Sequence, residues 1–113
     1  MIQVLHNPRC GKSRSCLAFL EESGKEFEVV KYLVDVPTVE ELHSIIKKIG
    51  ITPIELVRQK EPVWIEKFKG QVLSDEEIIN AMVQNPILIE RPIVINGEKA
   101  VIARPFEKAA TII

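Results

Sequence analysis

Within the first 32 residues, two strand-like segments flank one amphipathic helix, and this alternation constrains the fold more than any other feature of the chain. Ile2–Leu5 is a short apolar run of the kind found in buried strands. Residues 12–23 carry apolar side chains at helical spacing, and Gly24 follows as a helix stop. Residues 26–32 alternate as a strand does. This order predicts a right-handed parallel βαβ unit.

Two capping boxes predict the helices of the middle segment. Thr38 with Glu41, and Ser74 with Glu77, each pair a hydroxyl with a carboxylate three positions later. An apolar stripe follows each box, which predicts a helical insertion over about residues 37–85. Short helical turns are expected between the two helices, around Leu56, Val57, Trp64 and Phe68.

The last third of the chain contains a hairpin signal. Two apolar runs, residues 93–95 and 100–102, flank Asn96-Gly97, a pair suited to a tight primed turn. Pro105 can open a final helix whose inner face would carry Phe106, Ala109, Ala110 and Ile113. The order β-α-β, inserted helices, β-β-α predicts one α/β domain over residues 1–113, with a four-stranded mixed sheet.

Composition gives no general electrostatic reason to expect nucleic acid or a membrane as a partner. Lys and Arg number 15 against 16 acidic residues. The first residues lack the pattern of a signal peptide and no apolar run approaches membrane-spanning length, so we expect a cytoplasmic protein. Its small size and ordinary composition lead us to expect a monomer. Two Cys and two scattered His, His6 and His43, lack the spacing of a zinc site, so no metal is expected.

Cys10 stands in a Gly-containing, cation-flanked turn between the first strand and the first helix. Free amides and the positive end of the helix dipole favour a thiolate there, and they also bind oxyanions. The turn therefore predicts a nucleophilic cysteine facing a small anion, and the alternative is an idle cysteine in a solvated turn. Cys16 is six positions along the same helix, roughly 9 Å away at 1.5 Å per residue, too far for a disulfide. We expect Cys16 in the core, with a redox partner as the alternative.

Three arginines stand beside predicted element ends: Arg58, Arg91 before Pro92, and Arg104 before a second proline. The hairpin would bring Arg91 and Arg104 to one end of the sheet, where guanidinium groups could lower the pKa of Cys10 and hold an oxyanion. The alternative for each is a surface cation. His6, at the end of the first strand, could join the thiolate network, stabilise the thiolate when protonated, or be structural. A cis Arg91-Pro92 bond facing a reactive cysteine would be a hallmark of thioredoxin-like domains.

With these residues, the chain resembles the glutaredoxin-dependent arsenate reductases, an ArsC-like family with a thioredoxin-like fold, almost from end to end. The resemblance rests on several separated motifs: residues 6–14, Tyr32-Leu33, residues 56–58, residues 85–94 and Arg104-Pro105. It implies that Cys10 is the nucleophile and that Arg58, Arg91 and Arg104 bind arsenate. His6, Gly11, Ser13, Arg14 and Pro92 would support them.

The resemblance also implies a mechanism without a bound cofactor. Cys10 would attack arsenic, glutathione as co-substrate would reduce the adduct, and glutaredoxin would resolve the mixed disulfide. External thiols are needed because Ser13, not a second cysteine, stands three positions after Cys10. Lys12 departs from the small polar residue usual in the reductases, and we expect this change to alter anion affinity or the docking of glutathione.

Two other functions remain open for this sequence. The related Spx regulators share the fold and bind RNA polymerase, but they sense oxidation through a CxxC pair that this chain lacks. A monothiol oxidoreductase acting on glutathione mixed disulfides is the other alternative.

Overall fold

Four short strands form the mixed sheet that the sequence predicts. The computed structural model describes all 113 residues, and its strands are β1 (Ile2–Leu5), β2 (Phe27–Val30), β3 (Ile93–Asn96) and β4 (Lys99–Ile102). Their order in the sheet is β2-β1-β3-β4. β1 pairs parallel with β2 and antiparallel with β3, and β3 pairs antiparallel with β4. The predicted βαβ unit and hairpin therefore share one sheet.

The chain forms two compact units. The first comprises residues 1–35 and 91–113 and holds the sheet, helix α1 (Gly11–Glu22) and the 3-10 helix η3 (Phe106–Thr111). The second comprises residues 36–90 and is helical, with α2 (Val39–Ile49), η1 (Pro53–Leu56), α3 (Pro62–Lys67), α4 (Asp75–Gln84) and η2 (Pro86–Leu88).

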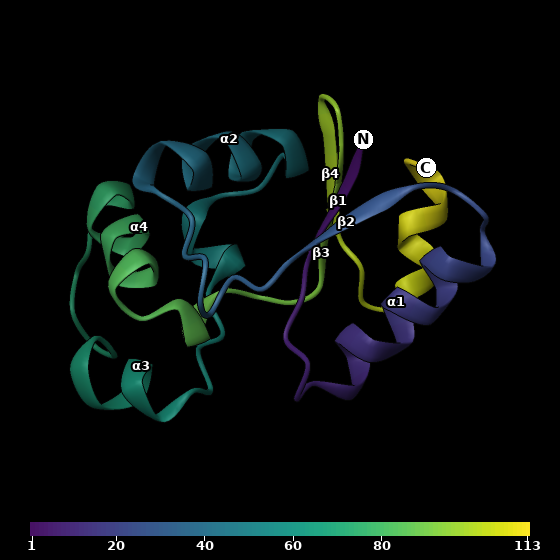
Figure 1. Ribbon diagram of the computed structural model, residues 1–113. Helices are drawn as coiled ribbons and strands as arrows, with labels where there is room; N and C mark the ends of the chain where they lie inside the picture. The colour runs from purple at the N-terminus through teal and green to yellow at the C-terminus, as the bar shows by residue number, and fades with distance from the viewer. The chain divides into compact units, whose positions relative to one another are not determined.

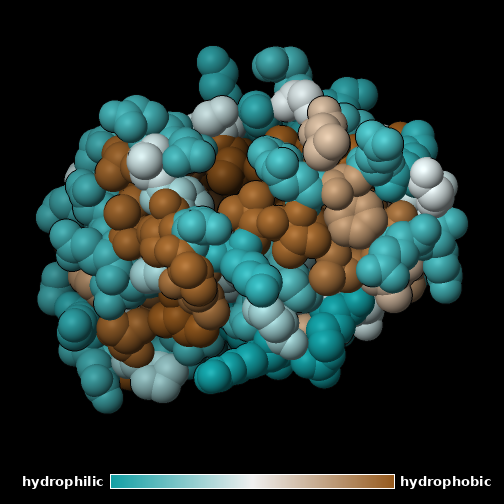
Figure 2. Space-filling view, in the orientation of Figure 1, coloured by the Kyte–Doolittle hydropathy of each residue, from teal (hydrophilic) through white to brown (hydrophobic).

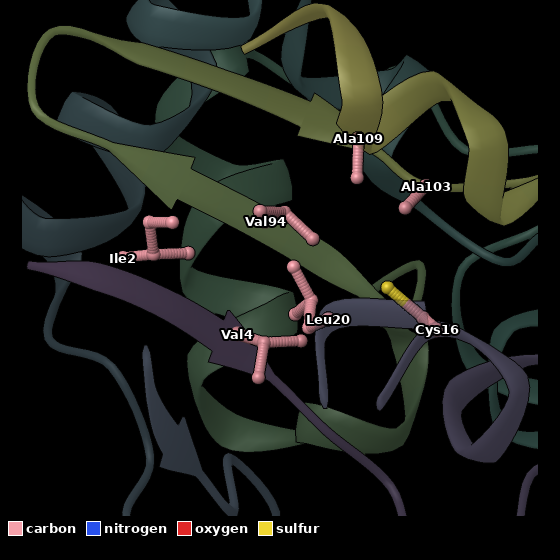
Figure 3. Packing of buried hydrophobic residues seen from close by; sticks show 7 residues of the cluster. All are labelled: Ile2, Val4, Cys16, Leu20, Val94, Ala103 and Ala109. Atoms are coloured by element: carbon pink, nitrogen blue, oxygen red, sulfur yellow. The ribbon is translucent and has the colours of Figure 1, made fainter. Parts of the chain in front are cut away.

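The core of the sheet unit lies between the sheet and its two helices. Val4 of β1 and Val94 of β3 are fully buried with Leu20 and Cys16 of α1, and their side chains converge in Figure 3. α1 lies beside η3 (Figure 1). The rings of Phe19 and Phe106 pack between these two helices, with 5.3 Å between their centroids. This packing fixes α1, and with it the loop that leads from β1 into α1.

The hairpin forms, but its turn lies one residue later than predicted. Asn96 still pairs with Lys99, so the two loop residues are Gly97 and Glu98, not Asn96 and Gly97. Gly97 has a positive φ of 61°, which glycine adopts without strain. With Gly97 as the first loop residue, Asn96 keeps its strand pairing, and its side-chain Nδ2 donates to the Ile112 carbonyl at 2.6 Å.

The final helix is a 3-10 helix rather than an α-helix, and the prediction that Ala110 lies on its inner face is wrong. A 3-10 helix repeats every three residues, so Phe106, Ala109 and Ile112 share a face. Ala109 is fully buried in the core, whereas Ala110 is exposed. β2 is likewise shorter than the predicted 26–32, because only Phe27–Val30 pair with β1.

In the helical unit, capping boxes stand at the starts of α2, η1 and α4. Both predicted capping boxes form, with Glu41 and Glu77 amides donating to the Thr38 and Ser74 hydroxyls at 3.1 and 3.2 Å. A third, which the prediction missed, opens η1, where the Thr52 amide donates to a Glu55 carboxylate oxygen at 2.6 Å. The residues behind the boxes fill the interior of this unit: Leu42, Ile45, Ile46, Leu56, Trp64, Ile78, Ile79 and Met82 are buried.

The surface mixes apolar with hydrophilic side chains, as the face in Figure 2 shows. Of the large apolar side chains that are exposed, several lie along and just after β2: Val29, Leu33, Val34 and Val36. None of the helices combines the length and apolar character needed to span a lipid bilayer.

Candidate active site

The loop between β1 and α1 is held by its own hydrogen bonds and places Cys10 directly before the helix. The Cys10 amide donates to the Asn7 carbonyl at 3.0 Å, and the Asn7 side-chain oxygen accepts from the Arg9 amide at 3.0 Å. Arg14 reaches back from α1, and its Nη1 donates to the Pro8 carbonyl at 3.0 Å. Cys10 has extended backbone angles as the N-cap residue of α1. Its thiol therefore lies among the first free amides of the helix.

The surroundings of Cys10 favour its ionised form. Partial burial opposes ionisation, but the backbone amides of Ser13 and Lys12 and the guanidinium of Arg91 outweigh it and lower the pKa of Cys10. The helix start supplies amides and the end of the sheet supplies the cation, so two separate elements stabilise the thiolate. The side chain is only half-buried, so a thiolate there can meet a solute.

The strand register explains how Arg91 and Arg104 come to this end of the sheet. Leu5, the last residue of β1, pairs with Ile93, the first residue of β3, and Ile93 pairs with Ile102, the last residue of β4. Arg91 precedes Ile93 by two positions, and Arg104 follows Ile102 by two. Both arginines thus flank the end of the sheet where β1 leads into the cysteine loop, as the sequence predicts.

Two guanidinium nitrogens of Arg91 make no hydrogen bond of good geometry within the protein. These atoms, Nε and Nη1, are both buried. The peptide bond that follows, Arg91-Pro92, is cis as predicted, and Pro92 is buried. Arg104-Pro105 is also cis, which the sequence analysis did not predict. A buried guanidinium with two such donors beside a thiolate is suited to bind an oxyanion.

His6 is buried and neutral rather than a cation beside the thiolate. Burial, with the positive charges of Lys31 and Arg14, lowers the pKa of His6. Burial and these cations therefore both disfavour a protonated His6 beside Cys10. The imidazole Nδ1 is buried and makes no hydrogen bond within the protein.

Arg58 belongs to the helical unit, where two carboxylates partly neutralise it. Its Nη1 lies 3.0 Å from a Glu61 oxygen, and its Nε lies 3.4 Å from a Glu90 oxygen. Its backbone is fixed as well, because the Arg58 amide donates to the Leu88 carbonyl at 2.7 Å beside the bridge between Val57 and Ile89. The sequence pattern predicts Arg58 for the site, but it does not predict these acidic partners.

The remaining residues of the loop differ in their environment. Ser13 is fully buried, and its Oγ accepts from the Asn7 amide at 3.4 Å, which ties the first turn of α1 to the start of the loop. Gly11 and Arg14 are exposed, as are Arg9 and Lys12. Ser13 therefore shapes the loop from within, while the cations of the turn face solvent.

Cys16 is a core residue, as expected. It is fully buried in the same core cluster as Leu20 and Val94 (Figure 3). It forms no disulfide, and burial raises its pKa to about 11. A thiol kept protonated in this way is a poor nucleophile at neutral pH. No group of three or more His, Cys, Asp or Glu side chains is placed to hold a metal ion.

Two residues of the site carried no role in the sequence analysis. Asn7 is buried and organises the cysteine loop through both its carbonyl groups. Tyr32 follows β2, is fully buried, and lies close enough to Arg91 and Cys10 to interact with both charges. An Asx turn at Asn7-Pro8 was a readable local signal. No local pattern places Tyr32 beside Arg91, which comes from the far end of the chain.

This fold, with one activated cysteine before α1 and a cis-proline at the same end of the sheet, defines a thioredoxin-like thiol protein. The chain belongs to the ArsC family, whose model matches residues 5–112. It is 44% identical to the Escherichia coli K12 protein YfgD, over 99% of this chain and 96% of that one. It is 41% identical to an arsenate reductase of Haemophilus influenzae, over 97% of each chain. A solved arsenate reductase of Vibrio cholerae is 39% identical and superposes with a TM-score of 0.95, covering 99% of this chain and 97% of that one.

Proposed function

We propose that this protein reduces arsenate to arsenite, with Cys10 as the nucleophile. Arg91 is the observation that carries the proposal: its buried guanidinium lowers the pKa of Cys10, and its Nε and Nη1 have no acceptor in the protein. A thiolate beside a guanidinium fork can attack the central atom of a tetrahedral oxyanion that the guanidinium holds. Relatives of this chain over its full length are named arsenate reductases.

The first chemical step displaces one oxygen of arsenate. The Cys10 sulfur forms a bond to arsenic, one arsenic–oxygen bond breaks, and the departing hydroxide takes up a proton and leaves as water. Arg91 and Arg104 would bind the oxyanion and stabilise the charge that builds up on its oxygens. Arg58 is the third arginine of the proposed binding set, with His6, Gly11, Ser13, Arg14 and Pro92 supporting the site.

The second step transfers two electrons and needs an external thiol. Glutathione attacks the Cys10–arsenic adduct, arsenic(V) becomes arsenic(III) and leaves as arsenite, and the two sulfurs join in a mixed disulfide. Glutaredoxin then reduces that disulfide and returns Cys10 to the thiolate. This protein offers no resolving cysteine of its own, because Cys16 is fully buried and kept protonated. The reaction would take place in the cytoplasm, where such thiols are kept reduced. The small size and ordinary composition of the chain make a monomer our expectation for its oligomeric state.

A coupled assay tests the proposal. Arsenate-dependent NADPH oxidation is followed with glutathione, glutathione reductase and glutaredoxin present. We expect turnover for the protein, none for Cys10→Ser, and a loss of about a hundredfold or more for Arg91→Ala. Cys16→Ala and Arg9→Ala are the matched controls, and both should keep most of the activity. Turnover that survives Cys10→Ser would contradict the proposal, and disulfide reduction without any arsenate dependence would favour a monothiol oxidoreductase.

A further inference from the structure

Tyr32 is fully buried, yet its hydroxyl lacks the well-formed hydrogen bond that a buried tyrosine usually makes. The His6 amide donates to the Val30 carbonyl at 2.9 Å, which continues the pairing of β1 with β2 past the end of both strands. Tyr32 follows two residues later and therefore belongs to the end of the sheet where the cysteine loop begins. It has no exposed surface, and its hydroxyl makes no hydrogen bond of good geometry to any protein atom. Buried tyrosine hydroxyls usually find a partner, so this one calls for a physical reason.

The neighbours of the hydroxyl are the groups of the proposed active site. Burial raises the pKa of Tyr32 to about 12, while the nearby Arg91 guanidinium and the Asn7 side chain work in the opposite direction. The charge of Cys10 also raises it. Tyr32 is therefore un-ionised at neutral pH, so it retains an O–H proton beside a thiolate and a guanidinium.

The Tyr32 hydroxyl is a neutral hydrogen-bond donor, and the Arg91 guanidinium beside it is a positively charged one. Nε and Nη1 of Arg91 can each donate to an oxygen, as can the Tyr32 hydroxyl, and none of these three groups makes a hydrogen bond of good geometry within the protein. The Arg91 guanidinium and the Asn7 side chain approach the Tyr32 oxygen as donors, which leaves the hydroxyl proton free. A tetrahedral oxyanion has enough oxygens to accept from all three at once. A neutral donor adds affinity for the anion without adding positive charge, so it can strengthen binding without further altering the ionisation of Cys10.

Resting on the proposed function, we propose that Tyr32 is an anion-binding residue of this site, whose O–H donates to an oxygen of the tetrahedral oxyanion held by Arg91 beside Cys10. The competing explanation is that Tyr32 only fills space at the end of the core. The two differ in what the oxygen atom does, because phenylalanine keeps the ring and removes only the hydroxyl.

Two measurements on the reduced protein separate these explanations. Inorganic arsenate is titrated into the protein, Tyr32→Phe and Thr111→Val by calorimetry at neutral pH. Thr111→Val is the control, because it removes a hydroxyl from exposed η3, where it bonds only the Lys108 carbonyl at 2.8 Å. We expect Tyr32→Phe to bind arsenate about tenfold to a hundredfold more weakly, and Thr111→Val to bind it normally.

Because the chain has a single tyrosine, near-ultraviolet difference absorbance gives the second measurement on the unaltered protein. Arsenate should produce a tyrosine difference band that Tyr32→Phe lacks. Equal affinity in Tyr32→Phe, or no tyrosine band when arsenate is bound, would overturn the role of Tyr32 and leave the proposed function standing. If the unaltered protein binds no arsenate, the proposed function fails and the role of Tyr32 fails with it.

Discussion

The Arg91 guanidinium lies beside the Cys10 thiol and lowers its pKa, although the two residues come from opposite ends of the chain. The antiparallel pairing of β1 with β3 creates this proximity, because the end of one strand lies against the start of the other. The charge that activates the cysteine therefore depends on the sheet as a whole. The amides of Ser13 and Lys12 depend only on the first turn of α1.

Ser13→Ala separates a structural role from an electrostatic one. The Ser13 hydroxyl is buried and accepts from the Asn7 amide, but it is the backbone amide of Ser13 that lowers the pKa of Cys10. We expect the variant to lose about 1 kcal/mol of unfolding free energy in urea and to keep a nearly unchanged pKa of Cys10. A rise of about one pKa unit would show that the hydroxyl, not the amide, supports the thiolate.

The two cysteines should differ sharply toward a thiol reagent. Cys10 is half-buried with a lowered pKa, whereas Cys16 is fully buried with a raised one. We expect the folded protein to react rapidly at one thiol with a chromogenic disulfide at neutral pH, and at the second only after unfolding. Peptide mapping should assign the fast thiol to Cys10. Rapid labelling of Cys16 in the folded protein would contradict its place in the core.

Cys16 should also make the fold less stable in alkali. Its pKa is about 11 in the folded protein against 9.0 ordinarily, so the unfolded chain releases the proton first as pH rises. Stability should therefore fall between the two values, by up to about 3 kcal/mol. Cys16→Ala costs stability at neutral pH by leaving a small cavity, but its stability should fall less over this range. Parallel stability curves for the two proteins would contradict the buried, protonated thiol.

Neutralising Glu61 tests whether Arg58 contributes to arsenate binding. Glu61 and Glu90 hold the Arg58 guanidinium at 3.0 and 3.4 Å, so they compete with any anion for its donors. If Arg58 binds arsenate, Glu61→Gln should tighten arsenate binding by a few-fold, to about tenfold at most. Glu66→Gln removes the same charge from exposed positions of α3 and should have little effect. Equal or weaker binding by Glu61→Gln would remove Arg58 from the binding set.

The parts of this fold that follow local rules could be predicted from the sequence. The capping boxes at Thr38 and Ser74 predict where α2 and α4 begin, because each satisfies backbone donors within four residues. The turn at Gly97 was misplaced by one residue because Asn96-Gly97 satisfies the same local rule as the turn that forms. Ala110 was misplaced because the final helix repeats every three residues rather than every 3.6.

Only part of the candidate site could be predicted from the sequence, namely the residues whose position in the sheet follows from a local pattern such as the hairpin or the helix start. The hairpin was enough to predict that Arg91 and Arg104 lie at one end of the sheet, and the helix start was enough to predict a lowered pKa for Cys10. The neutral state of His6 and the buried hydroxyl of Tyr32 depend on which charges and side chains surround them in three dimensions. The acidic partners of Arg58 lie three residues and 32 residues along the chain from it, at Glu61 and Glu90, and only the nearer has helical spacing.

Titration of the Cys10 thiolate by its ultraviolet absorbance, in Cys16→Ala so that only one cysteine contributes, tests the central claim most directly. The account predicts that the pKa of Cys10 in this variant lies clearly below that of an ordinary cysteine. Adding Arg91→Ala to Cys16→Ala should raise the pKa of Cys10 by about one unit, whereas adding Arg9→Ala should leave it unchanged. A Cys10 that stays protonated until its ordinary pKa, with or without Arg91, would contradict it.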